Sequence, residues 1–440
     1  MSRLLFLGLL AATALLLTAC PQTPPPPPVN PAECPVGPLQ AQATEEPLRL
    51  QGLGRFAGEY VPGELLVLPK PGLSVQALGA EGVEPQEALS QGLLRVKVPK
   101  GQEEAKARAL LRAGAQYVQP NYLYRPLRTP NDPLYTTDQK VYLNNLLRME
   151  AAWDQSTGQE SPPLIAVLDT GILDHEDFQA SKYLPAGVNL DVADGDADPT
   201  DRSADRGHGL AVASVLGADT HNGRGMAGVT WGGYIVPIKV FPDGGRGTTA
   251  TLLEGVRLAR SLGVRVANIS LRTDVYDRLL DAELAQARAQ GMVIVAAAGN
   301  YYESPYPGYS SGGPVVFPAS SPSTLAVGAV NQNRRRASFS ACGSELDLVA
   351  PGVGVLVAVP SGGYARFEGT SFASPIVAGV AALYMSKYAS ERGAWPTPDQ
   401  VYTCLTQTAE DLGPAGKDNE YGFGLVRADR VLTDTTYCFP

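Results

Sequence analysis

Three polar residues stand at positions where their side chains could form an activated nucleophile. Asp169 follows an apolar run that is typical of a strand, His208 lies between two glycines just before an expected helix, and Ser371 begins a helix of small residues. A carboxylate, an imidazole and a hydroxyl are the parts that this chemistry needs. In such a set His208 takes the proton of the Ser371 hydroxyl, while Asp169 orients the imidazole and stabilises its charged form. The sequence therefore predicts acyl transfer through Ser371.

Donors for the negative charge that develops in such a reaction are also present. A residue at a helix N-terminus, as expected for Ser371, has free backbone N–H groups beside it and a favourable helix dipole. Asn300 follows Gly299 at the end of a second apolar run, and its side-chain amide can donate to the same oxygen. Each residue alone could be a turn residue, a surface histidine or a helix cap. Their occurrence together favours the catalytic interpretation.

The elements that must position these side chains alternate between strands and helices from about residue 129 onward. The expected strands are 164–168, 234–240, 264–269, 292–298 and 324–330, and the expected helices are 209–217, 249–262, 275–290 and 371–385. Uninterrupted runs of aliphatic and β-branched residues are typical of a parallel sheet that is covered on both faces. We therefore expect an α/β domain over 129–440 with a doubly wound, mostly parallel sheet and a site at the carboxyl ends of its strands.

The chain ahead of this domain predicts an export signal, a spacer and a small unit. Residues 1–20 have a basic start, an uncharged apolar stretch and small residues at the end, as in a signal peptide. Leu17-Thr-Ala-Cys20 resembles the lipobox of bacterial lipoproteins, which implies a lipid anchor at Cys20; an ordinary cleaved signal is the alternative. Residues 21–50 read as a Pro-rich stalk, and residues 51–128 as a small α+β unit.

The overall charge narrows the range of partners. The 440 residues include 35 Lys and Arg against 44 Asp and Glu, so 35 − 44 gives a net charge of −9. Binding to nucleic acid needs basic patches that neutralise phosphates. We therefore expect no nucleic-acid partner, and we expect a monomer.

The segments AVLDTGI, GHG and GTSFASP, taken together, resemble those of the subtilisin-like serine proteases, and of thermitase-like members in particular. The order Asp, His, Ser is the one known for that family. The resemblance covers about residues 129–430 and implies a secreted endopeptidase that hydrolyses peptide bonds of proteins through an acyl-enzyme. It also implies that residues 51–128 are a prodomain. This prodomain would assist folding, block the active site and be removed by self-cleavage between about residues 124 and 129.

Two structural calcium sites are implied as well. Alternating carboxylates just upstream of His208 are the oxygen ligands that a hard cation prefers, and the loop resembles a calcium loop of thermitase-like enzymes. Its candidate ligands are Asp191, Asp194, Asp196, Asp198 and Thr200. The alternative is a solvated acidic loop. By resemblance, a second site joins the mature N-terminus to two loops through Asp132, Asp177 and Asn222.

The resemblance places two segments around the first specificity pocket. The expected substrate-binding residues are Ser270, Leu271, Arg272, Ala297, Ala298 and Gly299. Arg272 stands where the family usually has Gly, so it brings bulk and charge to a place of close backbone approach. The hypothesis is that Arg272 narrows the pocket or favours acidic side chains. If it blocks the cleft, the alternative is a catalytically impaired, surface-tethered binding protein on a protease scaffold. A further rival is an esterase that uses the same Ser.

The cysteines are compatible with export, because an oxidising compartment permits disulfides. Apart from Cys20, the chain has Cys34, Cys342, Cys404 and Cys438, which allow three connectivities. A bond between Cys404 and Cys438 would pin the C-terminal tail and is the favoured pairing. A bond from Cys34 to the catalytic domain would instead keep the mature enzyme tethered, and the sequence leaves this choice open.

Overall fold

The structure is a computed structural model that describes residues 50–57, 60–71, 82–123, 128–178, 188–303, 306–360 and 362–440. The expected signal peptide and almost all of the expected stalk, residues 1–49, lie outside the described residues. The chain divides into two units, residues 1–124 and 125–440, which are described one at a time. In the part of the chain that the structure describes, no helix is long and apolar enough to cross a membrane.

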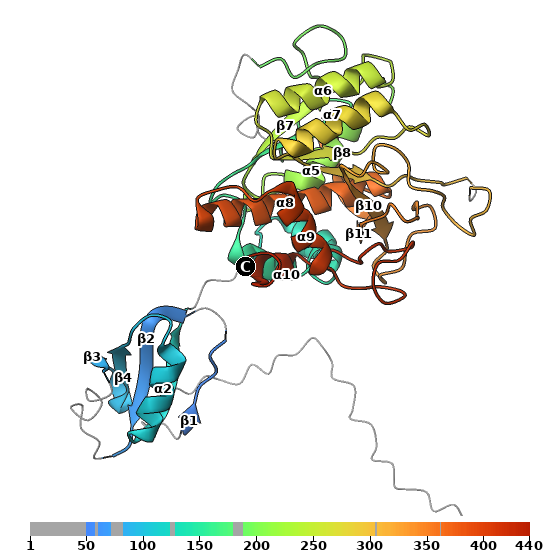
Figure 1. Ribbon diagram of the computed structural model, residues 1–440. Helices are drawn as coiled ribbons and strands as arrows, with labels where there is room; N and C mark the ends of the chain where they lie inside the picture. The colour runs from blue at the N-terminus through green and yellow to red at the C-terminus, as the bar shows by residue number, and fades with distance from the viewer. Residues whose placement is uncertain are drawn as a thin grey trace, which may run out of the picture. The chain divides into compact units, whose positions relative to one another are not determined.

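The described residues of the first unit form a five-stranded sheet and one α-helix (Figure 1). Its elements are β1 (Gly52–Leu53), β2 (Tyr60–Pro69), β3 (Glu84–Ala88), a 3-10 turn (Ser90–Gly92), β4 (Leu94–Lys97), α2 (Glu103–Arg112) and β5 (Ala115–Tyr122). Their order in the sheet is β1-β5-β2-β4-β3, and β2 pairs antiparallel with β4 and β5. Alternate side chains such as Leu65 and Val118 bury against Leu110 of the helix. This content of strands and helix agrees with the expected small α+β unit.

The second unit contains a six-stranded sheet, a two-stranded hairpin and eight helices among the described residues. The sheet strands are β6 (Leu164–Asp169), β7 (Tyr234–Lys239), β8 (Val266–Ile269), β9 (Val293–Ala297), β10 (Leu325–Val330) and β11 (Leu348–Pro351), and the hairpin is β12 (Val355–Val359) with β13 (Gly363–Phe367). The helices are α3 (Lys140–Leu143), α4 (Met149–Gln155), α5 (His208–Gly217), α6 (Thr249–Ser261), α7 (Arg278–Ala289), α8 (Thr370–Arg392), α9 (Pro398–Gln407) and α10 (Ala428–Thr433), with a π-helical turn at Tyr135–Gln139.

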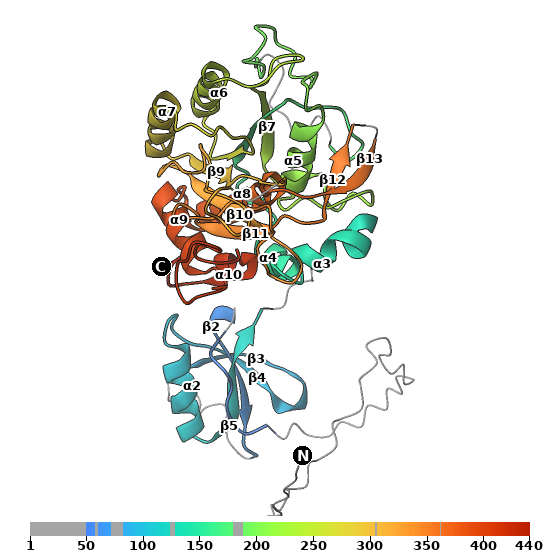
Figure 2. The same cartoon turned by 90° about the vertical axis from the view of Figure 1, so that its right-hand side faces the viewer.

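The predicted doubly wound sheet is confirmed. Its strand order is β11-β10-β9-β8-β6-β7, and every neighbouring pair is parallel. Helices α6 and α7 cover one face, while α5 and α8 pack together over the other (Figure 2). β6 lies between β7 and β8, so the chain passes from β6 to the neighbouring β7 and then crosses over to β8 on the other side of β6. Ligands bind at such a switch point, beyond the carboxyl ends of the strands.

Two helix boundaries differ from expectation at the residues that cap the helix. Helix α7 begins at Arg278 rather than at residue 275, because the Asp277 carboxylate accepts hydrogen bonds from the N–H groups of Leu279 and Leu280. Helix α8 runs on past residue 385 to Arg392 and ends where Gly393 adopts a left-handed conformation.

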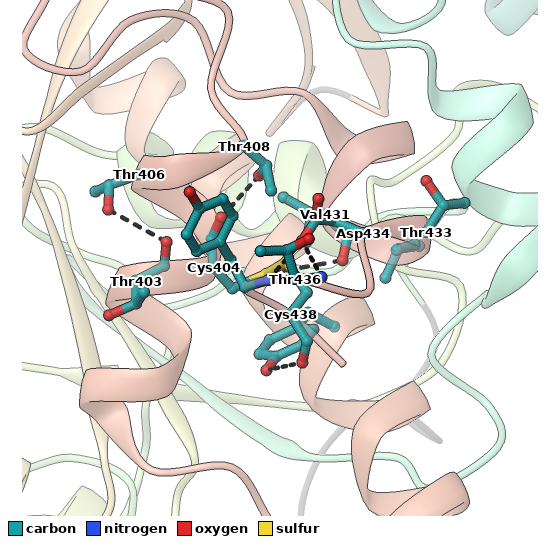
Figure 3. Close-up of a disulfide and its surroundings, with 12 residues drawn as sticks. Thr403, Cys404, Thr406, Thr408, Val431, Thr433, Asp434, Thr436 and Cys438 are labelled. Carbon is teal, nitrogen blue, oxygen red and sulfur yellow. Dashed lines mark hydrogen bonds between the residues drawn. A yellow bond between two sulfur atoms is a disulfide. The ribbon is translucent and has the colours of Figure 1, made fainter. Parts of the chain in front are cut away.

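The predicted disulfide between Cys404 and Cys438 is present (Figure 3). It joins α9 to the C-terminal tail, 34 residues further along the chain. The hydroxyl of Tyr384, on α8, donates to the Cys438 carbonyl at 2.8 Å. The tail is therefore fixed to two helices of the same unit. Cys342 is buried and has no disulfide partner among the described residues, and Cys34 lies outside them.

Candidate active site

Asp169 and His208 meet at the carboxyl end of β6. Asp169 is the last residue of that strand and is buried, and His208 is the first residue of α5. The imidazole Nδ1 lies 2.7 Å from Asp169 Oδ1, which also accepts the Thr170 N–H at 2.8 Å. The close approach of the two segments requires Gly209, because a Cβ at that position would lie 2.1 Å from the carbonyl oxygen of Gly171. The backbone itself thus holds the carboxylate against the imidazole.

The pKa of His208 reflects this neighbour. Burial disfavours the charged imidazole, but the charge and hydrogen bond of Asp169, together with the more distant charges of Asp205 and Asp201, outweigh that effect. The pKa of His208 therefore lies above its ordinary value. The side chain is 28% exposed, so part of the ring remains accessible to a ligand.

Ser371 and Asn300 come from two further elements. Ser371 is the second residue of α8, so its N–H belongs to the group that has no partner within the helix. Its Oγ makes only a long contact, 3.5 Å to the Ser270 carbonyl. Asn300 follows β9, and its Oδ1 accepts from both the N–H and the hydroxyl of Thr370, at 2.9 and 3.0 Å. These two bonds orient the amide and leave Nδ2 as the group that can donate.

One cavity of about 530 Å³ brings these side chains together, because His208, Asn300 and Ser371 all line it. Of the expected substrate-binding residues, Ser270, Leu271, Arg272, Ala297 and Gly299 line the same cavity. Ala298 does not line it. It is fully buried, and its peptide group bonds the carbonyl of Val327 and the N–H of Val316.

Several residues that line this cavity were not predicted from the sequence. They are Thr170, Asp205, Phe241, Arg246, Gly247 and Thr370. Arg246 lies in a glycine-rich stretch directly after β7, and that composition could have indicated a loop at the site's edge of the sheet. A second, largely apolar cavity of about 630 Å³ adjoins the first and shares Leu271 and Arg272 with it. The two cavities give room for several residues of an extended chain.

The acidic loop upstream of His208 surrounds a lysine. The ammonium group of Lys239, on β7, is buried and bonds Asp191 and Asp243 at 2.8 Å each, and it also bonds Asp194. Burial disfavours the charged ammonium, but the carboxylates outweigh it and hold the pKa of Lys239 above its usual value. Lys239 was not predicted from the sequence, although a Lys at the end of an apolar strand is an unusual signal.

The other candidate ligands of that loop are engaged elsewhere. Asp196 accepts the N–H of Asp198, and Asp198 accepts from Thr200 and from the guanidinium of Arg202. These contacts, with the hydrogen bond from the Thr200 hydroxyl first among them, lower the pKa of Asp198 to about 2. As placed, the carboxylates of this loop bind Lys239, Arg202 and backbone N–H groups, and calcium on this loop stays a prediction.

The second candidate set is different. Asp132 and Asp177 are almost fully buried, and no Lys or Arg of the described residues pairs with either carboxylate. Asp177 accepts from the Asn222 side chain at 3.0 Å, and Asp132 accepts from the Asn222 N–H at 3.2 Å. Burial raises the pKa of both carboxyls, and the charge of Asp132 adds to the rise at Asp177. Two buried carboxylates that repel each other fit a bound divalent cation.

Comparison with known proteins agrees with this arrangement. A model of the subtilase family of peptidases matches residues 161–424, which contain Asp169, His208, Asn300 and Ser371. The chain belongs to the subtilase family. This subtilase is a serine endopeptidase with the α/β fold described above.

Its relatives include proteases from several organisms. The chain is 32% identical over 375 residues to the thermophilic serine proteinase of Bacillus sp. (strain AK1), covering 83% of this chain and 86% of the relative. It is 37% identical over 286 residues to alkaline elastase YaB of Bacillus sp. (strain YaB), covering 64% of this chain and 68% of the relative. A solved protease structure from Pseudoalteromonas arctica PAMC 21717 is 29% identical, with a TM-score of 0.59, and covers 69% of this chain and 99% of that chain.

Proposed function

We propose that this subtilase is an exported serine endopeptidase, made as a self-processing zymogen, whose chemistry is done by Asp169, His208, Ser371 and Asn300. The observation that carries the proposal is the 2.7 Å contact between His208 and Asp169 at a cavity that Ser371 and Asn300 also line. An imidazole held by a buried carboxylate is the base that a serine hydroxyl needs.

The steps follow from these positions. His208 takes the Ser371 hydroxyl proton as Oγ bonds to the carbonyl carbon of the substrate, and the oxyanion accepts from Asn300 Nδ2 and the Ser371 N–H. The C–N bond then breaks, and His208 gives the proton to the leaving amine. Water then attacks the acyl-enzyme in the same way, with His208 again as base, and the carboxylic acid product is released. Asp169 stabilises the imidazolium in both halves.

A labelling experiment tests this function. A fluorophosphonate should modify Ser371 of the purified protein, and the same preparation should cleave casein. A protein that carries the label but cleaves only small esters would support an esterase. A folded protein that takes up no label would support a binding protein on the same scaffold.

The raised pKa of His208 predicts the pH dependence. Only the neutral imidazole can accept the Ser371 proton, so kcat/KM should fall as the pH drops through a pKa above the usual 6.5 of a histidine. Activity should reach its full value above that pKa, so the enzyme should work best at neutral to alkaline pH. A pH series of kcat/KM on one peptide measures this. A single-proton loss centred below pH 6 would contradict the effect of Asp169.

Removal of the Asn300 amide should slow the acylation step. Asn300→Ala is expected to lower kcat by about 10²–10³ with little change in KM, because the amide donates mainly to the oxyanion. Asn333→Ala, a loop variant outside the cavity, is the matched control. An equal loss of kcat in both variants, or a change in KM with kcat unaltered, would exclude the oxyanion role of Asn300.

Calcium is proposed at one site, held by Asp132, Asp177 and Asn222. A bound ion there would neutralise the two buried carboxylates and stabilise the folded protein. At a concentration 100-fold above its Kd it should raise the unfolding temperature by about 4 °C. Asp177→Asn should abolish this rise, whereas Asp399→Asn, on the surface, should keep it. A thermal shift that is the same with calcium and with chelator in the unaltered protein would contradict the site.

The remaining parts of the proposal concern the chain before the catalytic unit. Residues 51–128 would act as the inhibitory prodomain, and Cys20 would carry a lipid anchor at the cell envelope. The α+β fold of residues 52–122 supports the first point, and a relative from Natrialba magadii that is named an extracellular serine protease supports export. A cut near 124–129 would release the enzyme from the anchor. Proteins and peptides are the substrates, and the prodomain is the intramolecular partner of the monomer.

A further inference from the structure

More basic than acidic side chains line the catalytic cavity of a protein that is acidic as a whole. The chain has a net charge of −9, yet Arg246 and Arg272 line this cavity. Asp205, which is exposed, supplies the one carboxylate among the described lining residues. A cleft walled by protein focuses the field of its charges, so two cations inside it weigh more than charges spread over the surface. The cavity should therefore attract a negatively charged group.

Arg272 is held in place with donors to spare. Its guanidinium lies over the ring of Tyr301, 5.8 Å from the centroid, and the Tyr301 hydroxyl is fixed by a 2.9 Å bond to the Pro314 carbonyl. One guanidinium nitrogen lies 3.2 Å from the carboxylate of Asp274, whose side chain is 77% exposed. An arginine has five N–H donors, and an exposed ion pair is weak and exchanges readily. Arg272 can thus bind a further carboxylate without a change of position.

Arg246 is exposed in the turn after β7, and no carboxylate of the described residues forms an ion pair with it. Gly247, its neighbour, lines both cavities together with Leu271 and Arg272. Arg246 therefore offers an unneutralised cation to the same bound chain that Arg272 contacts.

We propose that this cavity selects acidic peptides, with Arg272 binding the carboxylate of the residue directly before the scissile bond and Arg246 adding attraction for the same segment. A guanidinium matches a carboxylate with two parallel hydrogen bonds, which an amide of the same shape cannot make. The inference rests on the proposed function of the cavity. It differs from a mere narrowing of the pocket, which would favour small side chains whatever their charge.

Matched peptides test the selection. Peptides that differ only in Glu, Gln or Ala before the scissile bond should be cleaved by the mature enzyme and by Arg272→Gln, Arg246→Gln and the double variant. The unaltered enzyme should favour Glu over Gln by about 10-fold in kcat/KM, or about 1.4 kcal/mol. The ratio should fall in each single variant and approach 1 in the double variant. Arg257→Gln, an equal loss of charge on α6 outside the cavity, should keep the full ratio. Added salt should reduce the preference.

Two outcomes would overturn the inference. One is a preference for Ala over both Glu and Gln, which would mean that Arg272 only narrows the pocket. The other is a ratio of Glu to Gln that is the same in the unaltered enzyme and the double variant. Fluorophosphonate labelling of the same preparations separates this failure from a failure of the proposed function. Protein that takes up the label but shows no charge preference overturns the inference alone, whereas protein that takes up no label overturns the function on which it rests.

Discussion

Ser371→Ala is expected to lower the turnover of peptide substrates by about 10⁶, the loss known for the nucleophile of subtilisin, a relative of this chain. The physical reason is that the other hydroxyls among the described lining residues are engaged: Thr170 donates to Asp201, Ser270 to the Ser371 carbonyl and Thr370 to Asn300. The neighbouring Ser374 hydroxyl is buried and bonds Ser270, so it cannot reach the cavity. His208 then has no hydroxyl to deprotonate, and the acyl-enzyme cannot form.

The residual rate of that variant is informative as well. The oxyanion donors and the substrate-binding residues remain, so a rate about 10³–10⁴ above water should persist. Ser261→Ala, the same change at an exposed position of α6 whose hydroxyl bonds only the Leu258 carbonyl, should retain full activity. Steady-state turnover of one peptide substrate by both proteins would measure the loss. Activity within 100-fold of the unaltered enzyme, after contamination is excluded, would remove Ser371 from its proposed role.

Lys239→Met should have the largest effect on stability outside the cavity. The ammonium of Lys239 is buried, and the Asp191 carboxylate beside it is fully buried as well. Removing one partner of a buried ion pair leaves an uncompensated charge and costs about 3–5 kcal/mol. The unfolding temperature should therefore fall by about 5–8 °C. The loss should also loosen the acidic loop, because Asp191 forms a β-bridge with Lys239.

A second variant tests the cause. If the loss of stability arises from carboxylates left without a cation, Lys239→Met combined with Asp191→Asn and Asp194→Asn should regain part of the lost stability. Lys140→Met, which removes an exposed partner of Glu150, should change stability by less than about 1 kcal/mol. Calorimetry on all four proteins gives the answer. An unfolding temperature of Lys239→Met equal to that of the unaltered protein would show that the ion cluster does not stabilise the fold.

The sequence predicted the parts of the fold that depend on one run of residues. The five strands predicted from unbroken aliphatic and β-branched runs are buried on both faces, and such a run reflects that burial. β3 escaped prediction because all its residues are exposed, and β11 because it is a four-residue strand that ends in Pro. The start of α7 was missed because Asp277 caps the helix, a choice that depends on local hydrogen bonds rather than on hydrophobic pattern.

The residues of the candidate site likewise fall into those that stand in motifs and those that depend on tertiary contacts. Asp169, His208, Asn300 and Ser371 stand in motifs, so the sequence could predict them as one group. In the structure His208, Asn300 and Ser371 line one cavity, and Asp169 contacts His208. Thr370, which orients the Asn300 amide, and Arg246, which lines the cavity, act through contacts between segments far apart in the chain. The pairing of Lys239 with the acidic loop is of the same kind, since residues 191 and 239 meet only after β7 has joined the sheet. Tertiary contacts of this sort leave no periodic trace in a sequence.

The central claim, that Ser371 is the nucleophile of a self-processing enzyme, is tested most directly by intact mass. The exported protein and its Ser371→Ala variant would be purified side by side with calcium present and weighed by mass spectrometry. The account predicts that the unaltered protein has lost everything before a point between residues 124 and 129, while the variant keeps its prodomain. The same mass for both proteins, whether full-length or cut, would contradict self-processing by Ser371.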